Sequence, residues 1–150
     1  MTSPSIVVEQ VAWAAAADVL SAIRRAVFVV EQGVPEQLEW DGIDPHCAHL
    51  LARLPDGTPV ATARIQGDGR IGRMAVLAPW RRIGVGSALL RELIRIAAGW
   101  GLSCVQLNAQ LHAVSFYAER GFCTEGEPFL DAGIPHQHMT YCLSGSPTSR

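Results

Sequence analysis

Residues 74–90 constrain the fold of this chain more than any other stretch. They read as an apolar strand, then the pair Arg81–Arg82, then Gly84 and Gly86 one residue apart, then a long helical pattern. Glycine backbone at the start of a helix leaves several N–H groups facing open space, and the helix dipole adds partial positive charge there. Together with the two forked guanidinium groups, this predicts a site for the phosphate group of a cofactor.

Two familiar phosphate-binding motifs do not fit this segment. A P-loop needs a lysine after its glycines, and the chain contains no lysine. A dinucleotide fingerprint needs a third glycine where this chain has Leu89, which leaves that reading weak. A plain glycine-rich turn with surface arginines also remains open at this point.

The bulk composition indicates one soluble globular domain spanning residues 1–150, with 49% hydrophobic and 17% charged residues. No stretch reaches the ~20 apolar residues of a membrane span, and the first residues lack the pattern of a signal peptide. We therefore expect a cytoplasmic protein without membrane association. The formal net charge of −2 argues against general nucleic-acid binding.

The four cysteines have no metal-ligand spacing, so no metal site is expected. Cys104 and Cys142 fall in apolar, strand-like runs and are predicted to be buried fillers. Disulfides are not expected in a reducing compartment.

The hydrophobic periodicity predicts an α/β fold with a mixed, mostly antiparallel sheet. Strands separated by tight turns should pair antiparallel, and the two strands that flank the central helix should run parallel. The expected strands are 6–11, 49–54, 60–66, 70–77, 103–108 and a hairpin of 122–127 and 136–143 around a loop at 128–135. The expected helices are 13–29, 84–99 and 112–120, with an acidic loop at 31–46 and a frayed tail at 144–150.

Two motifs in this order resemble the GNAT N-acetyltransferases. Arg81-x-x-Gly84-x-Gly86 is similar to the acetyl-CoA signature of that family. Downstream, Ala113, Phe116, Tyr117, Gly121 and Phe122 match its Ala-x-x-Phe-Tyr-x-x-x-Gly-Phe segment. Residues 27–32 and 133–139 further resemble an ElaA-like bacterial branch. The resemblance implies a GNAT fold, with a splayed central parallel pair of strands and helices on both faces of the sheet.

The resemblance also implies acetyl-CoA as cosubstrate and an acetyl transfer to a primary amine of a small molecule or peptide. Pyrophosphate would meet the loop and helix start formed by Arg81, Arg82, Ile83, Gly84, Val85, Gly86 and Ser87. The pantetheine arm would bond the main chain of a bulged strand at Met74, Ala75 and Val76, and the side-chain amide of Asn108.

The resemblance implies that Tyr117 is the general acid that protonates the departing thiolate. The alternative is that Tyr117 is only an aromatic residue of the core. The sequence does not fix the general base. Glu31 and His136 rank first because they lie in the ElaA-like segments, ahead of Glu36, Glu39, Asp41, Asp44, His49, His112 and His138. The acidic loop suggests a cationic acceptor, and Arg64 is either a surface charge or a clamp for an acceptor carboxylate. A non-catalytic CoA-binding sensor or scaffold remains the alternative, and a homodimer is possible.

Overall fold

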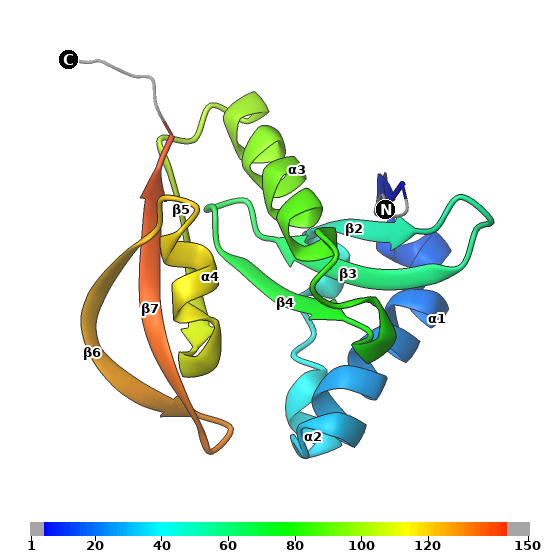
Figure 1. Ribbon diagram of the computed structural model, residues 1–150, viewed down its shortest axis with the longest axis horizontal. Coiled ribbons are helices and arrows are strands. Elements are labelled where there is room, and N and C mark those ends of the chain that lie inside the picture. The colour runs from blue at the N-terminus through cyan, green and yellow to red at the C-terminus, as the bar shows by residue number, and fades with distance from the viewer. Residues whose placement is uncertain (1–4, 144–150) are drawn as a thin grey trace.

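The computed structural model describes residues 5–143, so the predicted frayed tail lies outside the described part of the chain. Two sheets carry the fold (Figure 1). The first contains, in spatial order, β1 (Val7–Val11), β2 (Ala48–Arg53), β3 (Pro59–Ile65) and β4 (Ile71–Val76). The second contains β5 (Cys104–Gln110), β7 (Ile134–Cys142) and β6 (Cys123–Asp131). Neighbours within each sheet are antiparallel.

The helices connect and cover these sheets. Their bounds are α1 (Trp13–Arg24), the π-helical η1 (Arg25–Glu31), α2 (Glu36–Glu39), α3 (Val85–Gly99) and α4 (Val114–Ala118), with short 3₁₀ turns at Asp44–His46 (η2), Ala78–Trp80 (η3) and Leu111–Ala113 (η4). None of the helices in residues 5–143 is both long and apolar enough to cross a membrane.

The two sheets meet where β4 and β5 run parallel, and they meet only at one end. Arg70 forms an isolated parallel bridge with Gln106, and the Gln106 N–H donates to the carbonyl of Gly69 at 3.1 Å. Beyond that bridge the strands diverge, which confirms the predicted splayed pair (Figure 1). Within residues 5–143, the splay leaves one edge of β4 and one edge of β5 facing each other without a strand partner.

Helices cover both faces of the first sheet, as predicted. Successive residues of β2 show this, because side chains alternate between the faces of a strand. Leu50 packs in the cluster that contains the buried face of α3, whereas Leu51 packs with Leu20 and Ile23 of α1. β2 is therefore buried on both faces.

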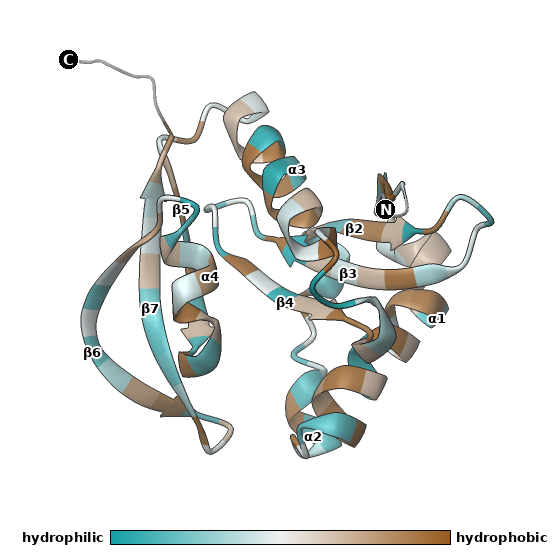
Figure 2. Ribbon diagram, in the orientation of Figure 1, coloured by the Kyte–Doolittle hydropathy of each residue, from teal (hydrophilic) through white to brown (hydrophobic). Residues whose placement is uncertain are grey.

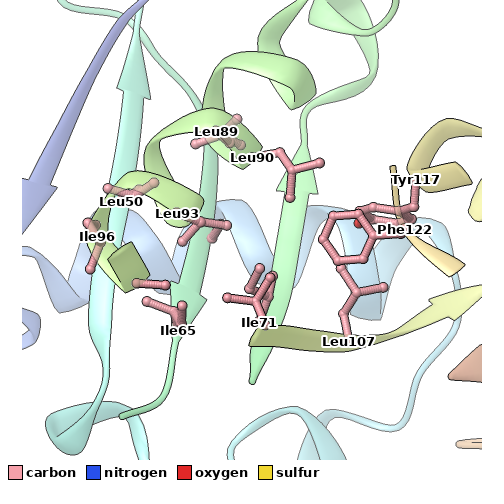
Figure 3. Packing of buried hydrophobic residues seen from close by; sticks show 14 of the residues in the cluster. Leu50, Ile65, Ile71, Leu89, Leu90, Leu93, Ile96, Leu107, Tyr117 and Phe122 are labelled. Atoms are coloured by element: carbon pink, nitrogen blue, oxygen red, sulfur yellow. The ribbon is translucent and has the colours of Figure 1, made fainter. Parts of the chain in front are cut away.

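The larger core lies between α3, α4 and the two sheets. Apolar and polar residues alternate around α3 (Figure 2), so that Leu89, Leu90 and Leu93 point inward and are at most 2% exposed. Figure 3 shows these leucines above the first sheet and Tyr117 and Phe122 beside Leu107 of β5. This core fixes α3 and α4 on the same side of the splayed strands.

The C-terminal hairpin differs from the sequence prediction. The expected loop at 128–135 is mostly strand, and the turn is only Ala132–Gly133, both with positive φ (54° and 77°), as in a type I′ turn. A register shift between Glu125 and Phe129 lets β6 continue past Pro128. The Gln137 side chain donates to the carbonyls of Glu125 and Gly126 and so satisfies this irregular stretch.

The helix predicted at 13–29 is present, but it changes from α-helix to the π-helix η1 after Arg24 and runs to Glu31. The expectation that Cys104 and Cys142 are buried is wrong. Both are exposed, because among residues 5–143 no helix covers the face of the second sheet on which they lie.

Candidate active site

The loop between β4 and α3 uses its two glycines for different reasons. Gly84 is the N-cap of α3 and has φ of 94°, a conformation that other residues rarely adopt. Gly86 has ordinary φ, but a Cβ there would lie 3.2 Å from the Phe116 ring of α4. Gly84 therefore shapes the loop, and Gly86 lets α4 approach the start of α3.

This loop also presents an uninterrupted row of main-chain donors. Within the described chain, the N–H groups of residues 82–87 donate to no protein acceptor. The start of α3 has no side-chain cap either, so the positive end of its dipole is open. Such an arrangement fits a phosphate or pyrophosphate group.

Arg81 is committed to the protein rather than to an incoming phosphate. Its two terminal nitrogens donate to the two carboxylate oxygens of Glu31, each at 2.6 Å, and its Nε donates to the carbonyl of Val76 at 2.8 Å. The hydrogen bond from Arg81 lowers the pKa of Glu31. In this arrangement Glu31 is a poor proton acceptor, and the neighbouring Arg82, which is exposed, is the better source of positive charge for a ligand.

β4 carries a bulge in its pairing with β3. Thr62 of β3 pairs with Ala75 and Arg64 pairs with Gly72, so two residues, Arg73 and Met74, lie opposite one residue of β3. Arg73 has φ of 48° at this point. A bulge turns main-chain groups away from the regular ladder, and among residues 5–143 no strand pairs with the other edge of β4 at this point.

Tyr117 of α4 reaches this bulge from the side of the core. Its hydroxyl donates to the Met74 sulfur at 3.6 Å, and its ring makes edge contacts with Phe116 and Phe122. Figure 3 shows Tyr117 beside Phe122. The side chain is 9% exposed, and burial raises its pKa to about 12. Tyr117 is therefore both a core aromatic and a hydroxyl next to the bulge, two roles that the sequence presents as alternatives.

A histidine pair lies on the opposite face of the second sheet. Leu107 and Met139 face the core, so their neighbours Asn108 and His138, which are register partners, face away from it. His138 Nδ1 donates to the Asn108 side-chain oxygen at 2.7 Å. This fixes the tautomer and leaves Nε2 as a proton acceptor.

His136, two residues earlier on the same face, has a similar arrangement. Its Nδ1 donates to the carbonyl of Ile134 at 2.6 Å, and its ring stacks on Phe129. It is 9% exposed. Nearby, Gln110 of β5 donates to Gln32 at 2.8 Å, which ties the end of η1 to this face.

The predicted acidic wall at 31–46 is not a free negative surface. Three of its five carboxylates alternate with arginines in a closed ring of six ion-paired side chains: Arg24, Asp44, Arg64, Asp41, Arg73 and Glu39. Three positive and three negative charges balance in this ring. Arg64 is thus a buried structural charge, neither a surface residue nor an acceptor clamp.

Two other base candidates are also engaged in structure. Glu36 pairs with Arg25 at 2.8 Å, and hydrogen bonding from Arg25 lowers its pKa. His49 is buried, donates from Nε2 to the carbonyl of Asp44 at 2.8 Å, and has its pKa lowered by burial. The remaining candidates are His112, His136 and His138.

A groove between α3 and the residues that follow α4 was not predicted. It has a volume of about 770 Å³ and is lined by Ser87, Arg91, Arg95 and Arg120 among others, with the one carboxylate Glu119. The i, i+4, i+8 spacing of the first three residues places them on one face of α3, a signal that the sequence did carry. Arg120 reaches back to Ser87 at 2.9 Å. Within residues 5–143 no group of three or more His, Cys, Asp or Glu residues is arranged to hold a metal ion.

Comparison with known proteins agrees with this geometry. The family model described as "Acetyltransferase (GNAT) domain" matches residues 10–143. YjcF of Bacillus subtilis, an uncharacterized N-acetyltransferase, is 40% identical over 122 residues, which is 78% of this chain and 86% of YjcF. Escherichia coli ElaA and an acyl-CoA N-acyltransferase from Pseudomonas aeruginosa each superpose with a TM-score of 0.81 and 31% identity, over 91% of this chain and 99% of theirs. The chain therefore belongs to the GNAT acetyltransferase family and is an acyl-CoA-dependent N-acyltransferase.

Proposed function

We propose that the protein transfers an acetyl group from acetyl-CoA to a primary amine of a small molecule or peptide. The observation that carries this is the coincidence of three features at one place. They are the splayed edges of β4 and β5, the bulge at residues 73–74, and the row of main-chain donors at residues 82–87. The Pseudomonas aeruginosa relative, described as an acyl-CoA N-acyltransferase, supports the same substrate class.

The residues present fit the parts of CoA. The donors at 82–87, with Arg82, suit the pyrophosphate. The unpartnered edges of β4, at Met74 and Ala75, and of β5 suit the amides of the pantetheine arm, whereas the Val76 carbonyl is already engaged by Arg81. The arginine-lined groove between α3 and α4 suits the 3′-phosphate at the adenosine end. When bound, acetyl-CoA supplies the activated thioester.

The amine would approach from the face that carries Asn108 and His138, because Tyr117 occupies the other face. His138 and His136 each hold a proton on Nδ1 and offer Nε2, so either can accept the proton that an ammonium must lose. We favour His138 over Glu31, whose carboxylate is held by Arg81. Asn108 would position His138 in addition to any contact with the cosubstrate.

Tyr117 would act on the departing sulfur mainly as a hydrogen-bond donor. Its pKa of about 12 lies above the ~8.5 of a free thiol, so complete proton transfer to a thiolate would cost about 5 kcal/mol. A phenol at that pKa stays protonated near neutral pH, and its O–H stabilises negative charge on sulfur without transferring the proton completely.

The acceptor class rests on the family and on the histidine face alone. Because the ring of six charges is balanced, the acidic loop no longer argues for a cationic acceptor. A homodimer and a cytoplasmic location stay predictions.

The test is acetylation of an amine panel containing spermidine, phenethylamine, glucosamine and a peptide with a free amino terminus. Product is measured by mass spectrometry, since the exposed thiols of the protein would react with a thiol reagent. The proposal predicts an acetylated product from at least one amine. In parallel, thermal-shift titrations compare acetyl-CoA, dephospho-CoA, ATP and NAD. The assigned subsites predict a larger increase in Tm with acetyl-CoA than with ATP or NAD. They also predict a smaller increase with dephospho-CoA, which lacks the 3′-phosphate.

The alternative function is a CoA-binding sensor or scaffold without turnover. It predicts the same thermal stabilisation by acetyl-CoA, but no acetylated product from any amine. Absence of stabilisation by acetyl-CoA would contradict both functions.

A further inference from the structure

Two thiols meet at the end of the second sheet, away from the proposed acyl-transfer site. Cys104 is the first residue of β5 and Cys142 the last of β7, and they are register partners. Their sulfur atoms lie 3.6 Å apart, and both residues are exposed. Cysteine is among the residue types most often buried, so an exposed pair in contact is unusual for a packing role.

The backbone places these thiols where a disulfide can form. The Leu143 N–H donates to the Ser103 carbonyl at 2.8 Å, so the next pair along the ladder is the hydrogen-bonded one. Cys104 and Cys142 therefore form a non-hydrogen-bonded pair, in which side chains approach more closely. The Cβ separation is shortest in such pairs and comes closest to the ~3.5–4.5 Å that disulfides need. With the sulfur atoms already 3.6 Å apart, only a small adjustment is needed to form the bond.

The other two cysteines are less suited to pairing. Cys123 lies on β6, the strand next to β7, but its register partner is Thr140, so it is diagonal to Cys142 rather than directly opposite. Cys47 is half-buried beside η2 and donates to the Ile43 carbonyl at 3.4 Å. The pairing is therefore specific to Cys104 and Cys142.

The pair lies beside the point where the two sheets are joined. Gly69, whose carbonyl accepts the bond from Gln106, approaches β5 so closely that a Cβ there would lie 2.8 Å from the Cys104 carbonyl oxygen. A disulfide between β5 and β7 here would stiffen the end of β5 at which the two sheets are joined. Asn108 lies four residues further along β5, where the two sheets have separated, and so is not next to the disulfide.

We propose that Cys104 and Cys142 form a redox-responsive modification site, which peroxide converts into an intramolecular disulfide. Cys104 thiolate attacks the peroxide oxygen, giving a sulfenic acid and, after protonation, water. Cys142 then attacks the sulfenic sulfur, forming the S–S bond and releasing a second water. The two sulfur atoms together lose two electrons, which reduce the O–O bond. The hydrogen bond shared with Cys104 raises the pKa of Cys142, so Cys104 is assigned the first attack on peroxide.

The site does not depend on the acyl-transfer proposal, and its test needs no substrate. The full chain is treated with hydrogen peroxide, its free thiols are blocked with N-ethylmaleimide under denaturing conditions, and the intact mass is measured. Four alkylated thiols are expected before oxidation and two after it, with all four recovered when dithiothreitol is added before blocking.

Glu-C digestion then places Cys104, Cys123 and Cys142 on separate peptides by cleavage after Glu119 and Glu125, and the linked peptides should be those of Cys104 and Cys142. Cys123→Ser is the matched control and should keep the disulfide, whereas Cys104→Ser should lose it. Any of four results would overturn the assignment. They are four alkylatable thiols after peroxide treatment, a disulfide that includes Cys123, oxidation to sulfonic acid without a disulfide, and a disulfide-linked dimer.

Discussion

Replacing Asp44 by Asn removes one charge from the ring of six ion-paired side chains without changing the size of the side chain. Asp44 Oδ1 accepts hydrogen bonds from Arg24 and Arg64, both at 2.8 Å, and all three side chains are at most 6% exposed. Arg24 is also held between Trp13 and Trp40, 5.6 and 5.2 Å from their ring centroids. Removing Asp44 leaves three arginines against two carboxylates in a site from which water is largely excluded.

The expected cost follows from that burial. Breaking a buried ion pair by removing one partner costs about 3–5 kcal/mol, because it leaves a charge without compensation. For a chain of this length that corresponds to a fall of about 10 °C in Tm. The assay is urea unfolding followed by circular dichroism, with Glu36→Gln as the matched control. Glu36 pairs with Arg25 at the surface, where such a pair contributes about 0–1 kcal/mol. A loss below about 1 kcal/mol in Asp44→Asn, or a loss equal to that of Glu36→Gln, would refute the buried-ring reasoning.

Three other predictions concern the active site, a close packing contact and the loss of stability at low pH. Tyr117→Phe should lower the acetylation rate about 10- to 100-fold, because it removes one hydrogen bond to a charged group in the transition state. The Kd for acetyl-CoA, measured by calorimetry, should not change, and an unchanged rate would contradict the assigned role. Gly121→Ala should lower the free energy of unfolding by about 1–3 kcal/mol in thermal unfolding, because φ is 97° and the new Cβ would lie 2.8 Å from the Tyr141 ring. The control Gly57→Ala is also at positive φ but in open space, so its loss should be smaller. Burial raises the pKa of Asp41, but the neighbouring Arg64 outweighs burial and lowers the pKa from 3.8 to about 2. The stabilisation by the Asp41 carboxylate is therefore complete above pH ~4 and lost as the pH falls toward 2. Across that range the free energy of unfolding in urea should fall by about 1–2 kcal/mol in the native chain and by less in Asp41→Asn.

The features that sequence predicted well are those fixed by local patterns. The apolar spacing of α3, the turn at Gly84 and the Phe116–Tyr117 segment each depend on neighbours within one or two helical turns. They were enough to predict the family, the splayed strands and helices on both faces.

The features that sequence missed depend on long-range contacts. The partners in the charge ring lie 15 to 34 residues apart with no regular spacing, so the acidic loop looked like an open surface. Pro128 begins the expected loop at 128–135, but pairing with β7 through an irregular register extends β6 across it. Cys104 was predicted to be buried because an apolar strand does not reveal which of its faces a helix will cover.

The central claim is that the start of α3 and the open edge of β4 hold the CoA part of the donor. The most direct measurement is the set of backbone amide chemical shifts of ¹⁵N-labelled protein during titration with acetyl-CoA. The account predicts that the largest changes fall on residues 82–87 and 74–76, with smaller changes elsewhere. Saturable binding of acetyl-CoA that leaves both of these segments unshifted would contradict it.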